Sequence, residues 1–198
     1  IAGSGSNGFL DGAALSARFR NPESLAINAN GDIIIADRNN NRIRMLDSSY
    51  TTVSTLADAT SASLSLPRAI AVDSTSNIYI ADTGNHRIKM LDSSSNVTTI
   101  AGDSAGYGDG DENRARFNEP SGLALDSTGK LYVADYRNNS IRLVDTTASY
   151  SAPQVHTVAG RNAHGNTEGV FGRGRMRRPR GSDRDSAGNL YIADYDNN

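Results

Sequence analysis

The chain contains no cysteine among its 198 residues. Disulfide bonds and thiolate chemistry are therefore excluded, although the cellular compartment stays open. No run of about 18 apolar residues occurs, so we expect no membrane-spanning segment, and no stretch of about 12 residues shows a helical period. The first residue is Ile1 and no signal peptide is visible, which indicates a processed chain or a piece of a longer one.

An excess of charge of one sign is also lacking. The formal net charge is −2, so nothing global points to nucleic acid or to an anionic membrane as a partner. Three histidines are present, His86, His156 and His164, and none falls on a strand that we expect to be innermost. No serine or carboxylate pair stands out either. We therefore expect no catalytic residue, no metal site and no cofactor within this chain.

One segment recurs along the chain in four copies. They are IIIADRNNNRIRMLD (33–47), IYIADTGNHRIKMLD (78–92), LYVADYRNNSIRLVD (131–145) and the shorter LYIADYDNN (190–198). A proline lies 15 residues before the Ala-Asp pair of every copy, whereas the connectors between copies differ in length. Constant units with variable connectors indicate a stack of identical supersecondary units.

Each unit is expected to form four short antiparallel strands. In the third copy these are GLALD (122–126), KLYVAD (130–135), SIRLV (140–144) and VHTVAG (155–160), with Gly, Asn, Asp and Ser between them. The first strand of each complete unit has a small alanine at one fixed position, so we expect that strand to be innermost. Four-stranded units repeated in this way are typical of β-propeller blades.

The segment ARFNEPSGLALDSTGKLYVADYRNNSIRLVD (115–145) resembles the NHL repeat, and so do residues 17–47 and 66–92. The resemblance covers nearly the whole chain. It implies an all-β propeller of four-stranded antiparallel blades, which in this family usually number about six. The chain would then be a fragment of a six-bladed ring.

The repeat predicts one propeller region over residues 1–198. Its expected parts are an outer strand of a preceding blade at 1–3, blades at 4–58, 59–102 and 103–160, and a partial blade at 161–198. Residues 173–185 depart from the pattern, because Ser182, Asp183 and Arg184 stand where the third copy is apolar. Unpaired charges on a buried strand cost several kcal/mol. Either this strand is built differently from the others, or the stretch is misread.

An aspartate and an asparagine three residues apart end the second strand of every copy. The pairs are Asp37 and Asn40, Asp82 and Asn85, Asp135 and Asn138, and Asp194 and Asn197. We expect structural turn pairs, in which the aspartate accepts N–H groups of its own turn and the asparagine tolerates left-handed geometry. A ring of carboxylates binding a metal is the alternative, but a site is normally built where one or two blades depart from the pattern.

Basic residues occur in two patterns. Arg44, Lys89 and Arg142 share one position of the third strand, where we expect a solvated face with the long stems packed on the next blade; contact with RNA is the alternative. A denser cluster comprises Arg173, Arg175, Arg177, Arg178 and Arg180. It lacks interleaved aromatic residues for base stacking, so we do not expect a nucleic-acid partner.

Two further motifs have weak signals. Asp109, Asp111 and Asn113 alternate as in a calcium loop, but the later bidentate glutamate is missing, so a glycine-rich crossover is expected. Sequons begin at Asn96 and Asn138, and they predict glycosylation if the protein is secreted. Asn96 falls in a turn that should be exposed, whereas at Asn138 a glycan would compete with the turn.

Two functions fit these observations. The first is a non-catalytic scaffold that binds a protein or assembles with itself, in an extracellular glycoprotein or a filament. The second, suggested by the resemblance, is a metal-dependent lyase or hydrolase of the NHL type whose ligands lie in blades outside this chain. A zinc and calcium assay on the full-length protein separates them.

Overall fold

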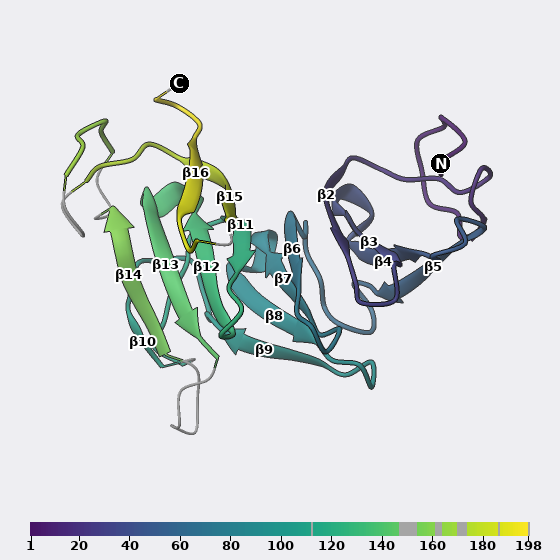
Figure 1. Cartoon of the computed structure of the whole chain (residues 1–198), viewed down its shortest axis with the longest axis horizontal. Coiled ribbons are helices and arrows are strands. Elements are labelled where there is room, and N and C mark those ends of the chain that lie inside the picture. The colour runs from purple at the N-terminus through teal and green to yellow at the C-terminus, as the bar shows by residue number, and fades with distance from the viewer. Residues whose placement is uncertain (112, 147–153, 161–163, 170–173, 186, 198) are drawn as a thin grey trace.

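The computed structural model describes residues 1–111, 113–146, 154–160, 164–169, 174–185 and 187–197. Apart from three short 3₁₀-helices, its regular elements are strands, which form four antiparallel sheets standing side by side along the chain (Figure 1). The all-β propeller expected from the repeats is confirmed, as an open part of a ring.

The strands follow the repeats closely. The first sheet contains β2 (Pro22–Ile27), β3 (Ile33–Asp37), β4 (Arg42–Leu46) and β5 (Thr52–Ala57). The second contains β6 (Ala69–Val72), β7 (Ile78–Asp82), β8 (Arg87–Leu91) and β9 (Val97–Ala101). The third contains β11 (Pro120–Leu125), β12 (Lys130–Asp135), β13 (Ser140–Asp145) and β14 (Gln154–Gly160), and the last sheet contains β15 (Pro179–Arg184) and β16 (Leu190–Asp194).

The first and third sheets also have a fifth strand that the repeat did not predict. β1 (Gly12–Ala13) pairs with β5, and β10 (Gly110–Asp111) pairs with β14. Both short strands come from the long connectors that precede their sheets. The second sheet has a shorter connector and four strands.

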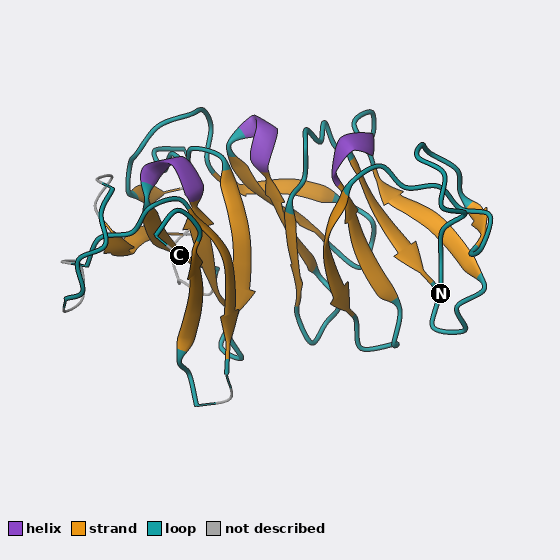
Figure 2. Ribbon diagram, turned by 90° about the horizontal axis from the view of Figure 1, so that it is seen from above, coloured by secondary structure: helices purple, strands orange, loops and turns teal. Residues whose placement is uncertain are grey.

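The first strand of each unit is innermost, as its small alanines predicted. β6 contacts both β2 and β11, and β11 contacts β15. Three 3₁₀-helices, η1 (Arg38–Asn40), η2 (Thr83–Asn85) and η3 (Tyr136–Asn138), lie along one side of the molecule, shown at the top of Figure 2. The inner strands begin at this same end, because Pro22 pairs with Asp37 and Pro120 with Asp135. We call this side the helix face.

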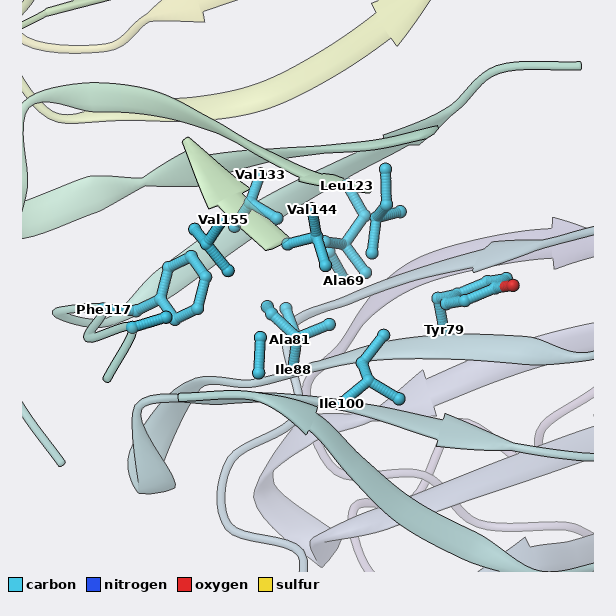
Figure 3. Packing of buried hydrophobic residues seen from close by; sticks show 13 residues of the cluster. Ala69, Tyr79, Ala81, Ile88, Ile100, Phe117, Leu123, Val133, Val144 and Val155 are labelled. Atoms are coloured by element: carbon cyan, nitrogen blue, oxygen red, sulfur yellow. The ribbon is translucent and has the colours of Figure 1, made fainter. Parts of the chain in front are cut away.

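Apolar side chains fill the spaces between neighbouring sheets. Between the second and third sheets, Phe117 and Val155 face Ala81 and Ile88 (Figure 3), and all four are at most 1% exposed. A similar cluster joins the first and second sheets. Burying an aliphatic or aromatic side chain of this size contributes about 1.5–3 kcal/mol. The stacking of sheets therefore supplies the core that a single sheet lacks.

The inner strand of the last sheet keeps its register in spite of its charges. Ser182 pairs with Ile192 and Asp183 with Tyr191. Arg184 has partners, because its Nη1 lies 3.0 Å from Asp126 Oδ2 and its Nε donates to the Gly188 carbonyl at 3.1 Å. Asp183 is exposed. The strand is therefore built like the other inner strands, with its charges paired or solvated.

The two ends of the stack are uncovered. Leu25 is 67% exposed, whereas Ile70 and Leu123, at the same position of the next two sheets, are 5% and 7% exposed. At the other end Tyr191 is 61% exposed, although its equivalent Tyr79 is 5% exposed. Residues 1–3, expected as an outer strand, form no strand; the Gly3 N–H donates to the Ala14 carbonyl at 2.8 Å.

Candidate functional site

The Asp-Asn pairs connect each second strand to the loop before its inner strand. In the first sheet, Asp37 Oδ1 accepts from the Arg20 N–H at 2.8 Å, and its Oδ2 accepts from Asn40 Nδ2 at 2.8 Å. The other three aspartates accept in the same way from the N–H groups of Ser65, Asn118 and Arg177. The prediction that each aspartate accepts backbone N–H groups of its own turn is therefore wrong, because the donating N–H lies 17 residues earlier in the chain.

In the first three pairs the asparagine ends a 3₁₀-helix and is not left-handed, and Asn197 of the fourth pair lies in a turn. In every pair the asparagine Nδ2 also donates to a carbonyl of the preceding connector, at Gly8, Ser63, Gly106 and Gly165. The left-handed residue is the next one, with φ of 53° at Asn41, 58° at His86 and 52° at Asn139. The sequence analysis missed this position.

These left-handed residues tie each sheet to the following one. Asn41 Oδ1 accepts from the Leu66 N–H at 2.7 Å, and Asn139 Oδ1 accepts from the Arg178 N–H at 3.0 Å. In the second sheet His86 Nδ1 has the same role and accepts from the Glu119 N–H at 3.1 Å. His86 is thus explained as a structural acceptor between blades.

The basic residues of the third strands are buried, so the expected solvated face is wrong. Arg44 and Arg142 are 0% exposed, and Lys89 is 7% exposed. Arg44 Nη1 lies 3.1 Å from Asp37 Oδ2, and its Nη2 lies 2.6 Å from Asp11 Oδ1. These basic side chains are buried because the connector before each sheet folds over the third strand. The alternation of side chains along the strand predicts only that they point away from the apolar face, and not that a connector covers them.

Two connector aspartates, Asp11 and Asp109, are partners of these arginines. Asp109 Oδ1 lies 2.7 Å from Arg142 Nη2, just as Asp11 lies against Arg44. In both pairs the aspartate lies 33 residues before its arginine. This constant spacing is visible in the sequence and could have predicted the pairing. The second sheet has the short connector and a lysine, and Lys89 Nζ donates to the Ala62 carbonyl at 2.7 Å.

Burial dominates the electrostatics of these pairs. Desolvation raises the pKa of Asp135 to about 6, even though Arg142 and the Asn118 N–H both favour its ionised form. Desolvation also raises the pKa of Asp82 and lowers the pKa of Lys89. The recurring polar residues are therefore occupied with one another inside the sheets. Among the described residues, no three His, Cys, Asp or Glu side chains are grouped as a metal site.

The remaining predicted residues lie apart from one another. His156 is exposed on β14, and His164 is exposed in the connector before the last sheet. Asn96 is exposed in its turn, whereas Asn138 is 3% exposed and donates from its Nδ2 to Asp135 and Gly106. Of the two sequons, only Asn96 presents its amide to solvent. Arg173 lies outside the described residues.

The blades differ most where the inner strands begin. The residue after the repeated proline is Glu23, Arg68, Ser121 or Arg180. These four residues line a cavity of about 670 Å³ on the helix face, together with Tyr195 and the start of each inner strand. We call this cavity the channel mouth.

Arginines and tyrosines alternate around the channel mouth. Arg68 Nε lies 2.8 Å from Glu23 Oε2. The guanidinium carbons of Arg68 and Arg178 each lie 5.8 Å from the centre of the Tyr136 ring, and that of Arg180 lies 4.6 Å from the Tyr195 ring. The arginine cluster therefore does have aromatic neighbours, which come from the turns at the ends of β12 and β16.

A second hollow lies on the other side of Tyr136, whose ring contacts Arg68 of the first hollow and Arg178 of the second. It has a volume of about 440 Å³ and is lined by Asn118, Arg137, Asn139, His164, Arg177 and Arg178. Arg137 Nε lies 2.5 Å from Glu119 Oε1, and Arg178 Nη1 lies 3.1 Å from Asp196 Oδ2. The helix face thus has two hollows, and arginines line both of them.

These features define a class of protein, the β-propellers built of repeated four-stranded blades. The family model of the NHL repeat matches residues 19–45, 64–90 and 117–142. The chain therefore contains three NHL repeats. No helix among the described residues is long and apolar enough to cross a membrane.

Solved structures share the fold at low sequence identity. An auxiliary nutrient binding protein from Bacteroides thetaiotaomicron aligns with a TM-score of 0.74 and 18% identity, over 91% of this chain and 47% of that one. The corresponding protein from Bacteroides ovatus gives 0.73 and 20% over the same shares. A catalytically inactive virginiamycin B lyase from Staphylococcus aureus gives 0.61 and 11%, over 89% and 50%. The chain spans about half the length of these proteins.

One curated protein is similar over a short segment. Protein SUPPRESSOR OF QUENCHING 1, chloroplastic, from Arabidopsis thaliana is 46% identical over 50 residues, which is 25% of this chain and 5% of that protein.

Proposed function

We propose that this chain is the binding part of a non-catalytic NHL-repeat scaffold, and that it holds a segment of a partner protein at the channel mouth. In this proposal residues 1–198 form one propeller region with blades at 4–58, 59–102, 103–160 and 161–198. The repeated residues stabilise the blades, and the residues that differ between blades select the partner.

One observation carries the proposal. The aspartates that the first three blades share, Asp37, Asp82 and Asp135, are buried and bonded to neighbouring polar groups, whereas the residue after each proline varies between Glu, Arg and Ser and lines one cavity of about 670 Å³. A concave site with apolar walls and a few polar groups is the usual form of a binding site. A carboxylate, two arginines and a serine around one opening supply such polar groups.

Gly181 permits a direct test of this site. It lines the channel mouth, its φ is not left-handed, and the nearest atom to an added Cβ is the Ala193 Cβ at 3.9 Å. Gly181→Phe should therefore fill the opening without disturbing the sheet. Random 12-residue peptides displayed on phage should yield binders to the wild-type chain that bind Gly181→Phe at least about tenfold more weakly.

The matched control is Ser74→Phe, because Ser74 is exposed in the turn between β6 and β7, at the end of the inner strand opposite the channel mouth, and its φ is not left-handed. Selected peptides that bind Gly181→Phe as well as they bind the wild type would refute a site at the channel mouth. A library that yields no binder at all would refute the scaffold proposal.

Secretion and a glycan on Asn96 belong to the same proposal. The Asn96 side chain is exposed, with its Nδ2 3.0 Å from Asp92 Oδ2. Intact-mass measurement before and after glycosidase treatment tests this in a secreting eukaryotic host. A secreted chain that carries no glycan on Asn96 would contradict it.

A further inference from the structure

We infer that the partner segment is acidic, and that its carboxylates bind the five arginines of the hollowed helix face. This inference rests on the proposed function and adds the chemistry of the ligand. The five residues, which we call the arginine surface, are Arg68, Arg137, Arg177, Arg178 and Arg180.

The arginine surface has an excess of positive charge in a chain whose net charge is −2. Three carboxylates pair with four of these five arginines: Glu23 with Arg68, Glu119 with Arg137, and Asp196 with Arg177 and Arg178. Arg180 has no carboxylate partner among the described residues. A local positive field of this kind attracts acidic segments and raises their association rate.

The arginines are also held in place before any ligand binds. Arg68 and Arg178 lie against the Tyr136 ring, and Arg180 lies against the Tyr195 ring. A guanidinium fixed by an aromatic ring loses less side-chain freedom when it binds, and its planar fork suits a carboxylate. The intramolecular pairs with Glu23 and Asp196 show that this geometry accepts carboxylates.

The same contacts favour a protein over a single-stranded nucleic acid. Recognition of single strands uses aromatic rings on which bases stack. The two tyrosines of this surface, Tyr136 and Tyr195, already have guanidinium groups against their rings. The surface therefore offers fixed positive charges rather than stacking platforms.

Binding of defined peptides to the 198-residue chain tests the inference. The probes are three fluorescein-labelled peptides of 12 residues in which Gly alternates with Glu, Lys or Gln, and a labelled uridine oligonucleotide. Fluorescence anisotropy should show binding of the glutamate peptide alone. Its affinity should fall about tenfold in Arg178→Gln/Arg180→Gln, and it should also fall as salt is raised from 0.05 to about 0.3 M.

Arg114→Gln is the matched control, since the Arg114 side chain is 83% exposed, on a connector away from the arginine surface. It should bind the glutamate peptide like the wild type. Circular dichroism and the unfolding midpoint of each variant report whether its fold is intact.

Three results would overturn the inference: equal binding of the glutamate and glutamine peptides, binding of the oligonucleotide alone, or equal loss in Arg114→Gln and in the double variant. The random library could also yield peptides that are not acidic but that still bind Gly181→Phe more weakly than the wild type. Such peptides would overturn the inference on acidic ligands and leave the proposed function standing. If the glutamate peptide does not bind and the random library yields no peptide that Gly181→Phe excludes, both the inference and the proposed function are refuted.

Discussion

At the scale of single residues, the recurring polar side chains form buried networks. Arg142 is an example, because its guanidinium contacts Asp135 at 2.9 Å and Asp109 at 2.7 Å and also the carbonyls of Arg116 and Gly108. Such a network adds little if all of it is replaced by apolar groups, but it is costly to break in one place.

We therefore expect Arg142→Met to lower the free energy of unfolding by about 3–5 kcal/mol, because it leaves Asp135 buried without its cation. Urea denaturation measures this loss. Adding Asp135→Asn to Arg142→Met should restore part of it, since the uncompensated charge is then removed. A loss below about 1 kcal/mol, as for a surface pair, would show that Arg142 is not buried as described.

The pH dependence of stability is also set by single residues. The pKa of Asp135 is raised to about 6, so this group binds a proton in the folded chain more readily than in the unfolded chain. Its contribution is present below about pH 4 and is lost as pH rises through 6. Asp58 acts in the opposite sense, because the Ser61 N–H lowers its pKa to about 2, and its contribution is lost as pH falls from about 4 to 2.

Relative to Asp135→Asn, the wild type should therefore gain stability as pH falls from 7 to 4, measured by urea unfolding at each pH. A wild type that loses stability relative to Asp135→Asn over this interval would show that the ion pair outweighs burial at this carboxylate.

The sequence showed which residues recur, but it did not predict which groups these residues contact. It paired Asp37 with Asn40 correctly as neighbours, because they are three residues apart. It did not predict that Arg20 donates to Asp37, or that Asp11 covers Arg44, because both contacts depend on how a connector folds back over the sheet. Period 2 tells which face of a strand a residue lies on, but not what covers that face.

At the scale of elements, the unit of four strands and its innermost strand were predictable from alternation and turn residues. The fifth strands β1 and β10 were not, because two-residue strands in glycine-rich connectors leave no periodic signal. The hydrogen bond that each left-handed residue accepts from a backbone N–H of the next blade was also unpredicted. The sequence does contain a signal at this position, because Asn41, His86 and Asn139 all have a side-chain acceptor that can reach the next blade.

The contact between blades at His86 is testable by exchange of side chains. His86→Asn should be as stable as the wild type within about 0.5 kcal/mol, because asparagine supplies the acceptor in the other sheets and tolerates left-handed geometry. His86→Gly also tolerates that geometry but leaves the Glu119 N–H without its acceptor. It should be about 1 kcal/mol less stable, measured by thermal unfolding. Equal stability of the two variants would show that this hydrogen bond contributes nothing.

At the scale of the whole molecule, two apolar faces are exposed at opposite ends of the stack. On the first sheet Leu25 and Ile27 are 67% and 69% exposed, and on the last sheet Tyr191 is 61% exposed. The corresponding positions inside the stack are covered by a neighbouring blade. Uncovered apolar faces associate with other apolar surfaces.

The 198-residue chain alone should therefore self-associate as its concentration rises, in sedimentation equilibrium. Leu25→Lys/Tyr191→Lys should shift this equilibrium toward the monomer, because a charge on each face opposes burial. A wild-type chain that stays monomeric over the full concentration range would contradict the prediction.

The central claim is that shared residues build the blades and that differing residues at the channel mouth bind the partner. Hydrogen–deuterium exchange of the chain, with and without a peptide selected from the random library, tests it most directly. We expect added protection confined to the helix face, at the starts of β6, β11 and β15 and at η3. Protection confined to the outer strands β5, β9 and β14 would contradict it.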